Sequence, residues 1–108
     1  MGTPQMSTKQ TYSVDERLRA LANYRRRALL RYMSENGNSA SVDDLVREVV
    51  TTTPSAVRQP TEDRVETQLH HVDIPKLVDA GVVEYDPQKG KVRYRSDEMV
   101  ETVLRAVE

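Results

Sequence analysis

Four basic side chains stand close together near the end of this 108-residue chain: Lys89, Lys91, Arg93 and Arg95. In an extended strand, a period of two sends Lys91, Arg93 and Arg95 to the same face. Ammonium and guanidinium groups neutralise phosphates, and like charges on one short segment repel one another unless a partner offsets them. This cluster therefore predicts a surface that contacts a polyanion.

The segment that carries these cations, 82–95, has the pattern of a β-hairpin. Val83 and Tyr85 alternate with other residues before a turn at 86–90 that contains proline and glycine. Val92 and Tyr94 alternate with the cations after the turn. Two short alternating runs joined by turn residues predict two paired antiparallel strands.

A second basic region precedes it, with six arginines and no acidic residue between Arg17 and Arg31. Arg25, Arg26 and Arg27 are consecutive and belong to a predicted helix at 24–35, which Asn23 can cap and the turn residues at 36–38 can end. Two interpretations remain open for these three arginines. They could contact phosphates, or they could form a solvated face that pairs with neighbouring acidic residues.

The longest predicted helix, at 61–80, has two apolar stripes. Val65 and Leu69 lie on one side of it. Ile74 and Leu77 point roughly the opposite way when residues advance by 100° each. Pro75 stands at the changeover, and proline removes a helical hydrogen bond and clashes with the preceding turn. We therefore expect a bend or break at 73–75.

The first and last predicted helices, which begin at Ser13 and Ser96, each have an apolar stripe. The stripe of the last helix is too long to leave exposed, so we expect a homodimer. It could instead fold back on the first helix. The residues expected at the dimer interface are Val14, Leu18, Leu21, Met99, Val100, Val103, Leu104 and Val107.

Length and composition limit the class of protein. A mass of 12.3 kDa leaves room for one domain, and a hydrophobic content of 37% without Phe or Trp makes its core small. The absence of cysteine excludes disulfides and thiolate chemistry. We expect three regions: a disordered arm at 1–12, the main domain at 13–95 and a dimerisation helix at 96–108, with a third helix from Ser41 and a loop at 51–60 inside the domain.

The sequence contains no nucleophile signature, phosphate-binding glycine loop or carboxylate pair of the kind that enzymes use. Adjacent histidines on one helix point about 100° apart and do not readily share a metal ion, so we interpret His70, in phase with Ile74 and Leu77, as a partly buried structural residue. We expect no enzymatic activity, cofactor, metal or small-molecule substrate. No apolar run suggests a signal peptide or a membrane span, which favours a cytoplasmic protein.

Three segments carry a family resemblance. Residues 21–33, LANYRRRALLRYM, resemble the opening of the second helix in arsenic-repressor-type winged-helix regulators, and residues 77–85, LVDAGVVEY, resemble the end of their recognition helix. Together with LHHVDIP at 69–75, the chain looks most similar to a winged-helix family of unknown function common in haloarchaea, over roughly residues 15–95. The abundance of Arg, Val, Thr, Asp and Glu also resembles proteins of salt-loving archaea.

This resemblance implies a mainly α fold with a small β-hairpin wing, the winged helix-turn-helix, in which the fourth helix enters the major groove. It implies that Thr61, Arg64, Gln68 and His71 meet DNA, while the hairpin contacts phosphates or the minor groove. The expected function is a sequence-specific regulator of transcription that binds double-stranded DNA as a homodimer. The alternative, favoured by the acidic residues of the fourth helix, is a protein-interaction module that does not bind DNA.

Overall fold

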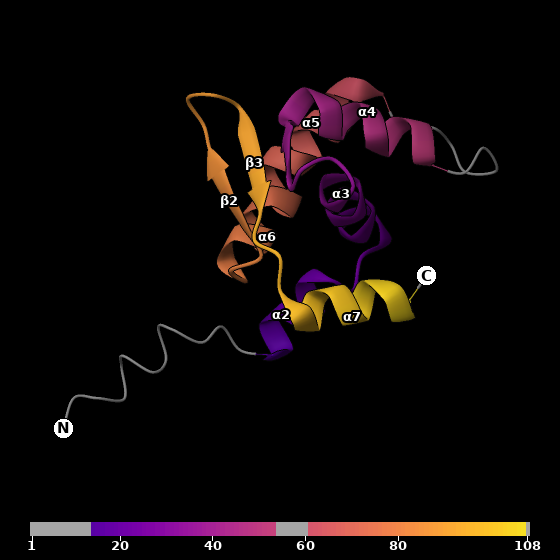
Figure 1. The fold of residues 1–108 in the computed structure, drawn as a ribbon. Coiled ribbons are helices and arrows are strands. Elements are labelled where there is room, and N and C mark those ends of the chain that lie inside the picture. Colours follow the sequence, from indigo (N-terminus) through magenta and orange to yellow (C-terminus); the bar gives the residue numbers. More distant parts are fainter. Residues whose placement is uncertain (1–13, 54–60, 108) are drawn as a thin grey trace.

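The computed structural model describes residues 14–53 and 61–107 (Figure 1), so the expected arm at 1–12 and most of the expected loop at 51–60 lie outside it. The described residues are mainly helical, with a small antiparallel sheet, as expected for an α+β protein. The elements are α2 (Val14–Ala20), α3 (Tyr24–Ser34), β1 (Ser39–Ser41), α4 (Val42–Thr52), α5 (Glu62–Gln68), the π-helical segment η1 (Leu69–Asp73), α6 (Ile74–Asp79), β2 (Val83–Asp86), β3 (Lys91–Tyr94) and α7 (Glu98–Ala106).

The helix ends follow the capping residues seen in the sequence. Asn23, Ser41 and Thr61 each accept a hydrogen bond from a backbone N–H in the first turn of the helix that follows. Asp97, the residue after Ser96, does the same for α7. Asn38 has a φ of 66°, in the left-handed region that asparagine tolerates, and it redirects the chain after α3.

The three strands form one sheet in the order β1-β3-β2. The predicted hairpin is confirmed: Val83 pairs with Tyr94, and Asp86 pairs with Lys91. Strand β1 was not predicted, because Ser39–Ser41 has one small apolar residue and too little alternation to indicate a strand. It pairs with the edge of β3 that β2 does not occupy, with Ala40 opposite Val92. β1 also contacts α3 and α4, so it connects the sheet to these two helices.

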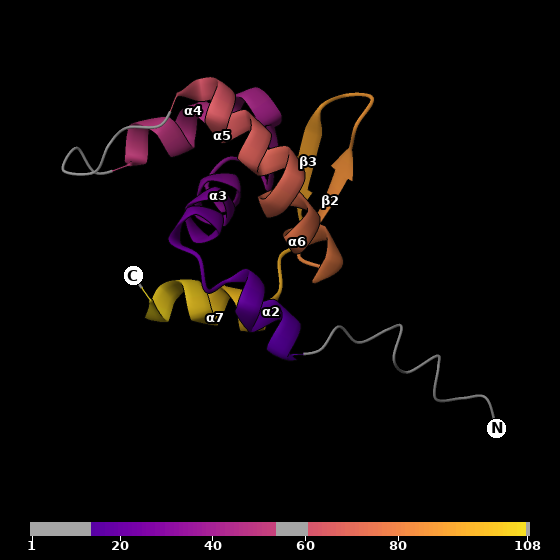
Figure 2. The ribbon, with the colours of Figure 1, turned by 180° about the vertical axis from the view of Figure 1, so that it is seen from behind.

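A single apolar core joins the helices to the inner face of the sheet. α7 contributes Val100 and Leu104 to it, so this helix packs within the same unit as the rest of the chain. α2 and α7 lie together at the end of the molecule opposite the hairpin tip (Figures 1 and 2). Across 14–53 and 61–107, no helix has the length and apolar character needed to cross a bilayer. The most deeply buried side chains include Leu29, Leu30, Met33, Leu45, Leu69, Leu77, Val82 and Val92.

The segment η1 explains the two apolar stripes of the longest helix. The N–H of Ile74 donates to the carbonyl of Leu69, five residues earlier, so this turn holds one residue more than an α-helical turn. The extra residue rotates the following part of the helix by about 100°, which brings Ile74 and Leu77 into phase with Leu69. Pro75 follows at the start of α6, where its missing N–H is tolerated. The interruption expected at 73–75 is therefore present as a π turn that ends at Asp73.

Asp73 is fully buried and lies at the centre of an ionic cluster with Arg25 and Arg26. Its carboxylate accepts hydrogen bonds from Nε and Nη2 of Arg25 at 3.0 and 3.2 Å and from Nη1 of Arg26 at 3.0 Å. Arg26 also donates to the carbonyl of Ala20 at 2.6 Å, at the end of α2. The cluster therefore ties α2, α3 and the end of η1 together and sets the position of the long helix.

Tyr94 connects β3 to α7, since its hydroxyl donates to Glu101 at 2.6 Å. Burial and the neighbouring carboxylate of Glu101 raise the pKa of Tyr94 above its usual value. The raised pKa means that the unfolded state loses this proton first as pH rises. The contribution of the protonated Tyr94 hydroxyl to stability is therefore complete below about pH 10 and is lost progressively above that pH.

We expect Tyr94→Phe to lower the free energy of unfolding by about 1–2 kcal/mol near neutral pH, because the hydrogen bond to Glu101 is lost. The variant should also lose less stability than the wild type between neutral and strongly alkaline pH. Urea unfolding followed by circular dichroism at several pH values measures both effects. Tyr24→Phe, at an exposed tyrosine, is the matched control. Equal alkaline slopes for wild type and Tyr94→Phe would contradict this assignment.

Candidate nucleic-acid interface

Three cations of the hairpin are exposed and form no ion pair with any described residue: Lys89, Lys91 and Arg93. Lys91 and Arg93 alternate with the buried residues Val92 and Tyr94, so both point away from the core, as the sequence predicted. Lys89 lies in the turn at the tip, which projects beyond the helices (Figure 1). The hairpin thus presents three positive charges that have no internal partner among these residues.

The neighbouring strand β2 offsets part of this positive charge, which was not predicted from the sequence. Glu84 lies opposite Arg93 in the register, and Asp86 lies opposite Lys91. The fourth predicted cation, Arg95, forms an ion pair with Glu84 at 2.6 Å, and both side chains are more than half exposed. The positive surface is therefore narrower than four free cations would make it, and it runs along β3 to the tip.

The predicted base-contacting residues of the long helix are all exposed: Thr61, Arg64, Gln68 and His71. Arg64 and Gln68 are four residues apart on one face of α5, and they line a shallow hollow of about 410 Å³ together with Asp63 and Thr67. Thr67 was not among the residues predicted from the sequence, although its spacing of three residues from Arg64 could have indicated it. This face offers hydrogen-bond donors and acceptors to a ligand outside the protein.

The other flank of α5 is acidic and faces the hairpin. Glu62 and Glu66, four residues apart, are exposed on it. Glu66 lies 3.8 Å from His70, and the ring of His70 meets Tyr85 of β2 edge-on at 6.1 Å. His70 keeps 37% of its side chain exposed, because the π turn rotates Ile74 and Leu77 away from its phase and its ring is covered by Tyr85 instead.

The three arginines of the basic run in α3 bind groups within the protein. Arg25 and Arg26 bind Asp73, and Arg26 is buried. Nη1 of Arg27 donates to the carbonyl of Leu21 at 2.8 Å. The prediction that Arg25 and Arg26 contact DNA is therefore wrong, because their guanidinium groups bind Asp73, whereas DNA contact by the partly buried Arg27 stays a prediction. Arg25 and Arg26 do pair with an acidic residue, which was the other interpretation. That residue is the buried Asp73, 48 and 47 positions away along the chain.

The residues expected at a dimer interface divide into two groups. Leu21, Val100 and Leu104 are buried in the core of one chain and cannot contact a second copy. The alternative, that the last helix folds back on the first, holds only in part: Val100 and Leu104 share the core with Leu21, whereas the other residues of the first stripe are exposed. Exposed or partly exposed residues remain on the two helices, namely Val14 and Leu18 of α2, Met99 and Val103 of α7, and Val107 just after it.

Comparison with known proteins places the chain in a family but does not assign a function. No curated protein matches it, and no solved structure does. One family, described as a domain of unknown function (DUF7344), matches residues 18–93, which include every element from α3 to β2 and most of β3. This match covers well over half of the chain, and the protein is therefore a member of the DUF7344 family.

Proposed function

We propose that this protein is a winged-helix regulator that binds double-stranded DNA. The order of α3, β1, α4, the helix from α5 to α6, and the β2–β3 hairpin supports this assignment, as does the strand order β1-β3-β2. In it, the helix from α5 to α6 is the recognition helix and the hairpin is the wing. The proposal includes no enzymatic activity.

The observation that carries the proposal is the group of unpaired cations on β3 and at the hairpin tip. These cations lie at the same end of the molecule as the start of α5, away from α2 and α7 (Figures 1 and 2). Lys89, Lys91 and Arg93 would bind phosphates while the exposed face of α5 enters the major groove. Arg64 has the donors to read guanine, and Gln68 has the amide to read adenine. Thr61 and His71 flank them along the helix.

The acidic flank of α5 restricts how the helix can approach DNA. Glu62 and Glu66 would be repelled by phosphates, so the flank with Arg64 and Gln68, which also carries Asp63, must lead into the groove. Repulsion on one side and attraction on the other favour one orientation over its reverse. We infer that the acidic flank serves as a guide for orientation and keeps nonspecific affinity low.

An anisotropy titration of labelled genomic DNA fragments at a series of salt concentrations tests this proposal. If the hairpin binds three phosphates, a plot of the logarithm of the association constant against the logarithm of the salt concentration should have a slope of about −2.7 or steeper. DNA selected from a random pool should converge on a preferred sequence. No binding to any fragment at any salt concentration would refute the proposal.

The proposal includes a homodimer formed by the exposed apolar residues of α2 and α7. A twofold axis at this end would leave the recognition helix of each copy outside the dimer interface. We expect Leu18→Glu with Val103→Glu to convert the dimer to a monomer in light scattering. Tyr24→Glu, at an exposed site on α3, should leave it unchanged. A dimer that survives the double substitution would place the interface elsewhere.

A second candidate function is a protein-interaction module, which the acidic residues of α5 favour. Three exposed carboxylates in two helical turns suit a basic partner surface. A pull-down after nuclease treatment separates the two functions. A partner retained without nucleic acid, combined with absent DNA binding, would favour this alternative.

A further inference from the structure

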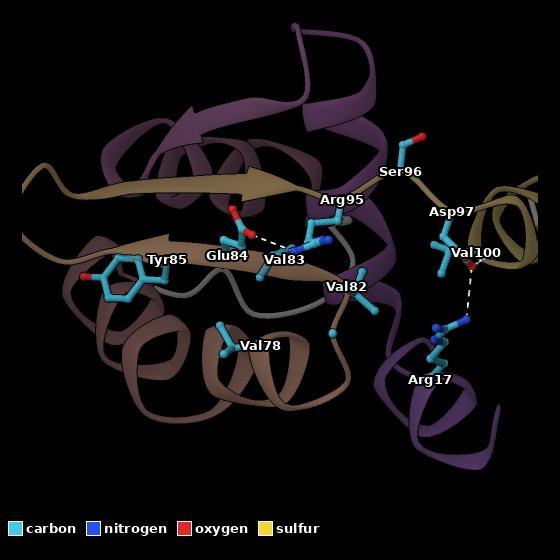
Figure 3. Close-up of a pocket in the computed structure, with 11 residues that line it drawn as sticks. Arg17, Val78, Val82, Val83, Glu84, Tyr85, Arg95, Ser96, Asp97 and Val100 are labelled. Atoms are coloured by element: carbon cyan, nitrogen blue, oxygen red, sulfur yellow. Dashed lines mark hydrogen bonds and ion pairs between the residues drawn. The ribbon is translucent and has the colours of Figure 1, made fainter. Parts of the chain in front are cut away.

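A groove lies along β2, away from the proposed DNA-binding face of α5. It has a volume of about 630 Å³. Val78 of α6 and Tyr85 of β2 border it at one end, and Arg17 of α2 and Asp97 border it at the other (Figure 3). Val78 is one of the few large apolar side chains in the described part of the chain that remain exposed. The groove therefore combines an apolar wall with charged groups at its end.

One wall of this groove is the free edge of β2. This strand pairs only with β3, and the N–H of Arg95 donates to the carbonyl of Val82. In an antiparallel ladder the bonded pairs alternate, so the backbone groups of Val83 and Tyr85 point away from β3. No backbone hydrogen bond of the described chain satisfies them across that edge. An added strand would satisfy these backbone groups.

Arg17 closes one end of the groove with unused hydrogen-bond donors. Its Nη1 contacts Asp97 at 3.3 Å and the sulfur of Met99 at 3.9 Å. Within residues 14–53 and 61–107, its Nε and Nη2 have no hydrogen-bond partner. Asp97 is itself engaged, because the same carboxylate oxygen caps α7. A guanidinium held in one place with free N–H groups on two of its nitrogens suits a carboxylate that binds through both oxygens.

Two exposed carboxylates lie beyond the opposite end of the groove, outside its lining. Tyr85 is followed by the exposed Asp86, and Glu66 lies beyond the ring of His70, which contacts Tyr85. A ligand with a positive group at this end and a negative group at Arg17 would match both. Since β2 runs from Val83 towards Asp86, a peptide with its carboxyl end at Arg17 would run antiparallel to β2, the arrangement that the free edge accepts well.

We propose that this groove binds the C-terminal segment of a partner protein as an additional antiparallel strand on β2. The terminal carboxylate binds Arg17, an apolar side chain packs against Val78, and a basic residue upstream lies near Asp86. The main-chain groups of Val83 and Tyr85 bind the peptide backbone. This site is separate from the proposed DNA surface, and it stands whether or not the protein binds DNA.

The experiment uses the full chain labelled with ¹⁵N and a synthetic peptide, acetyl-Lys-Thr-Val-Thr-Val with a free carboxylate. We expect amide shifts along β2 and slower hydrogen exchange at the N–H groups of Val83 and Tyr85. Amidation of the peptide terminus should weaken binding by about tenfold or more, because a charge-assisted pair is lost. Arg17→Gln should lower the affinity for the carboxylate peptide by a similar factor. Arg19→Gln, on the same helix, should leave this affinity unchanged.

Three results would overturn the proposal. The first is no shift along β2 at millimolar peptide. The second is equal affinity for the carboxylate and amide peptides, which would remove the role of Arg17. The third is unchanged exchange at Val83 and Tyr85 in the presence of bound peptide, which would exclude strand addition. The exchange measurement uses the wild-type protein, so it decides the question even if Arg17→Gln folds poorly.

Discussion

Replacement of Asp73 by alanine is expected to lower the free energy of unfolding by about 3–5 kcal/mol. The substitution leaves Arg25 and Arg26 without their carboxylate, and Arg26 is buried. A buried cation without a partner loses its hydration and gains nothing in return. Domains of this size have a total stability of about 5–15 kcal/mol, so the variant should be close to unfolding at room temperature.

Urea unfolding followed by circular dichroism measures this loss, with Asp79→Ala as the control. Asp79 is an exposed carboxylate on the same long helix, and its loss should change stability by no more than about 0.5 kcal/mol. The combined substitution Arg25→Met, Arg26→Met and Asp73→Met should recover much of the lost stability, because no unpaired charge remains. A loss below about 1 kcal/mol in Asp73→Ala would contradict the role assigned to this cluster.

Neutralising two hairpin cations, in Lys91→Gln with Arg93→Gln, should lower DNA affinity about 100-fold at 0.1 M salt. Each phosphate contact contributes about 0.9 to the slope of log K against log salt, which corresponds to nearly tenfold in affinity at this concentration. The slope itself should become shallower by about two, and the loss should be similar for every DNA sequence. Both side chains are exposed, so the fold should be unaffected.

The matched control is Arg19→Gln with Arg105→Gln, which removes the same charge from exposed arginines on α2 and α7, at the opposite end of the molecule. Anisotropy titrations of both variants over the same salt series give the comparison. If the two variants lose equal affinity, the hairpin has no special role, and the effect comes from net charge alone.

The local features of this fold could be read from the sequence, because their causes are local. Asn23, Ser41 and Thr61 are capping residues placed directly before apolar periodic segments, and the structure has helices that begin after each of them. The hairpin follows from alternation on both sides of a proline- and glycine-containing turn. The exposure of Lys91 and Arg93 follows from the same alternation.

Features that depend on distant parts of the chain could not be predicted in this way. The pairing of Arg25 and Arg26 with Asp73 joins residues about 48 positions apart, and nothing in the run of arginines indicates which acid they bind. β1 forms because β3 offers it a free edge, which its own three residues do not reveal. The two stripes around Pro75 indicated an interruption, but the choice of a π turn depends on packing of the helix against the core.

A helix with one surplus residue can lose that residue without disturbing the core. Removal of one exposed residue between Leu69 and Asp73 would let Ile74 bond to Leu69 with ordinary α-helical spacing, and the apolar side chains on both sides would keep their phase. Such a deletion would place Pro75 inside a continuous helix, so it should occur together with loss of the proline. Among members of the family, the length of this helix can therefore vary by one residue during evolution, and the variation should be linked to the residue at position 75.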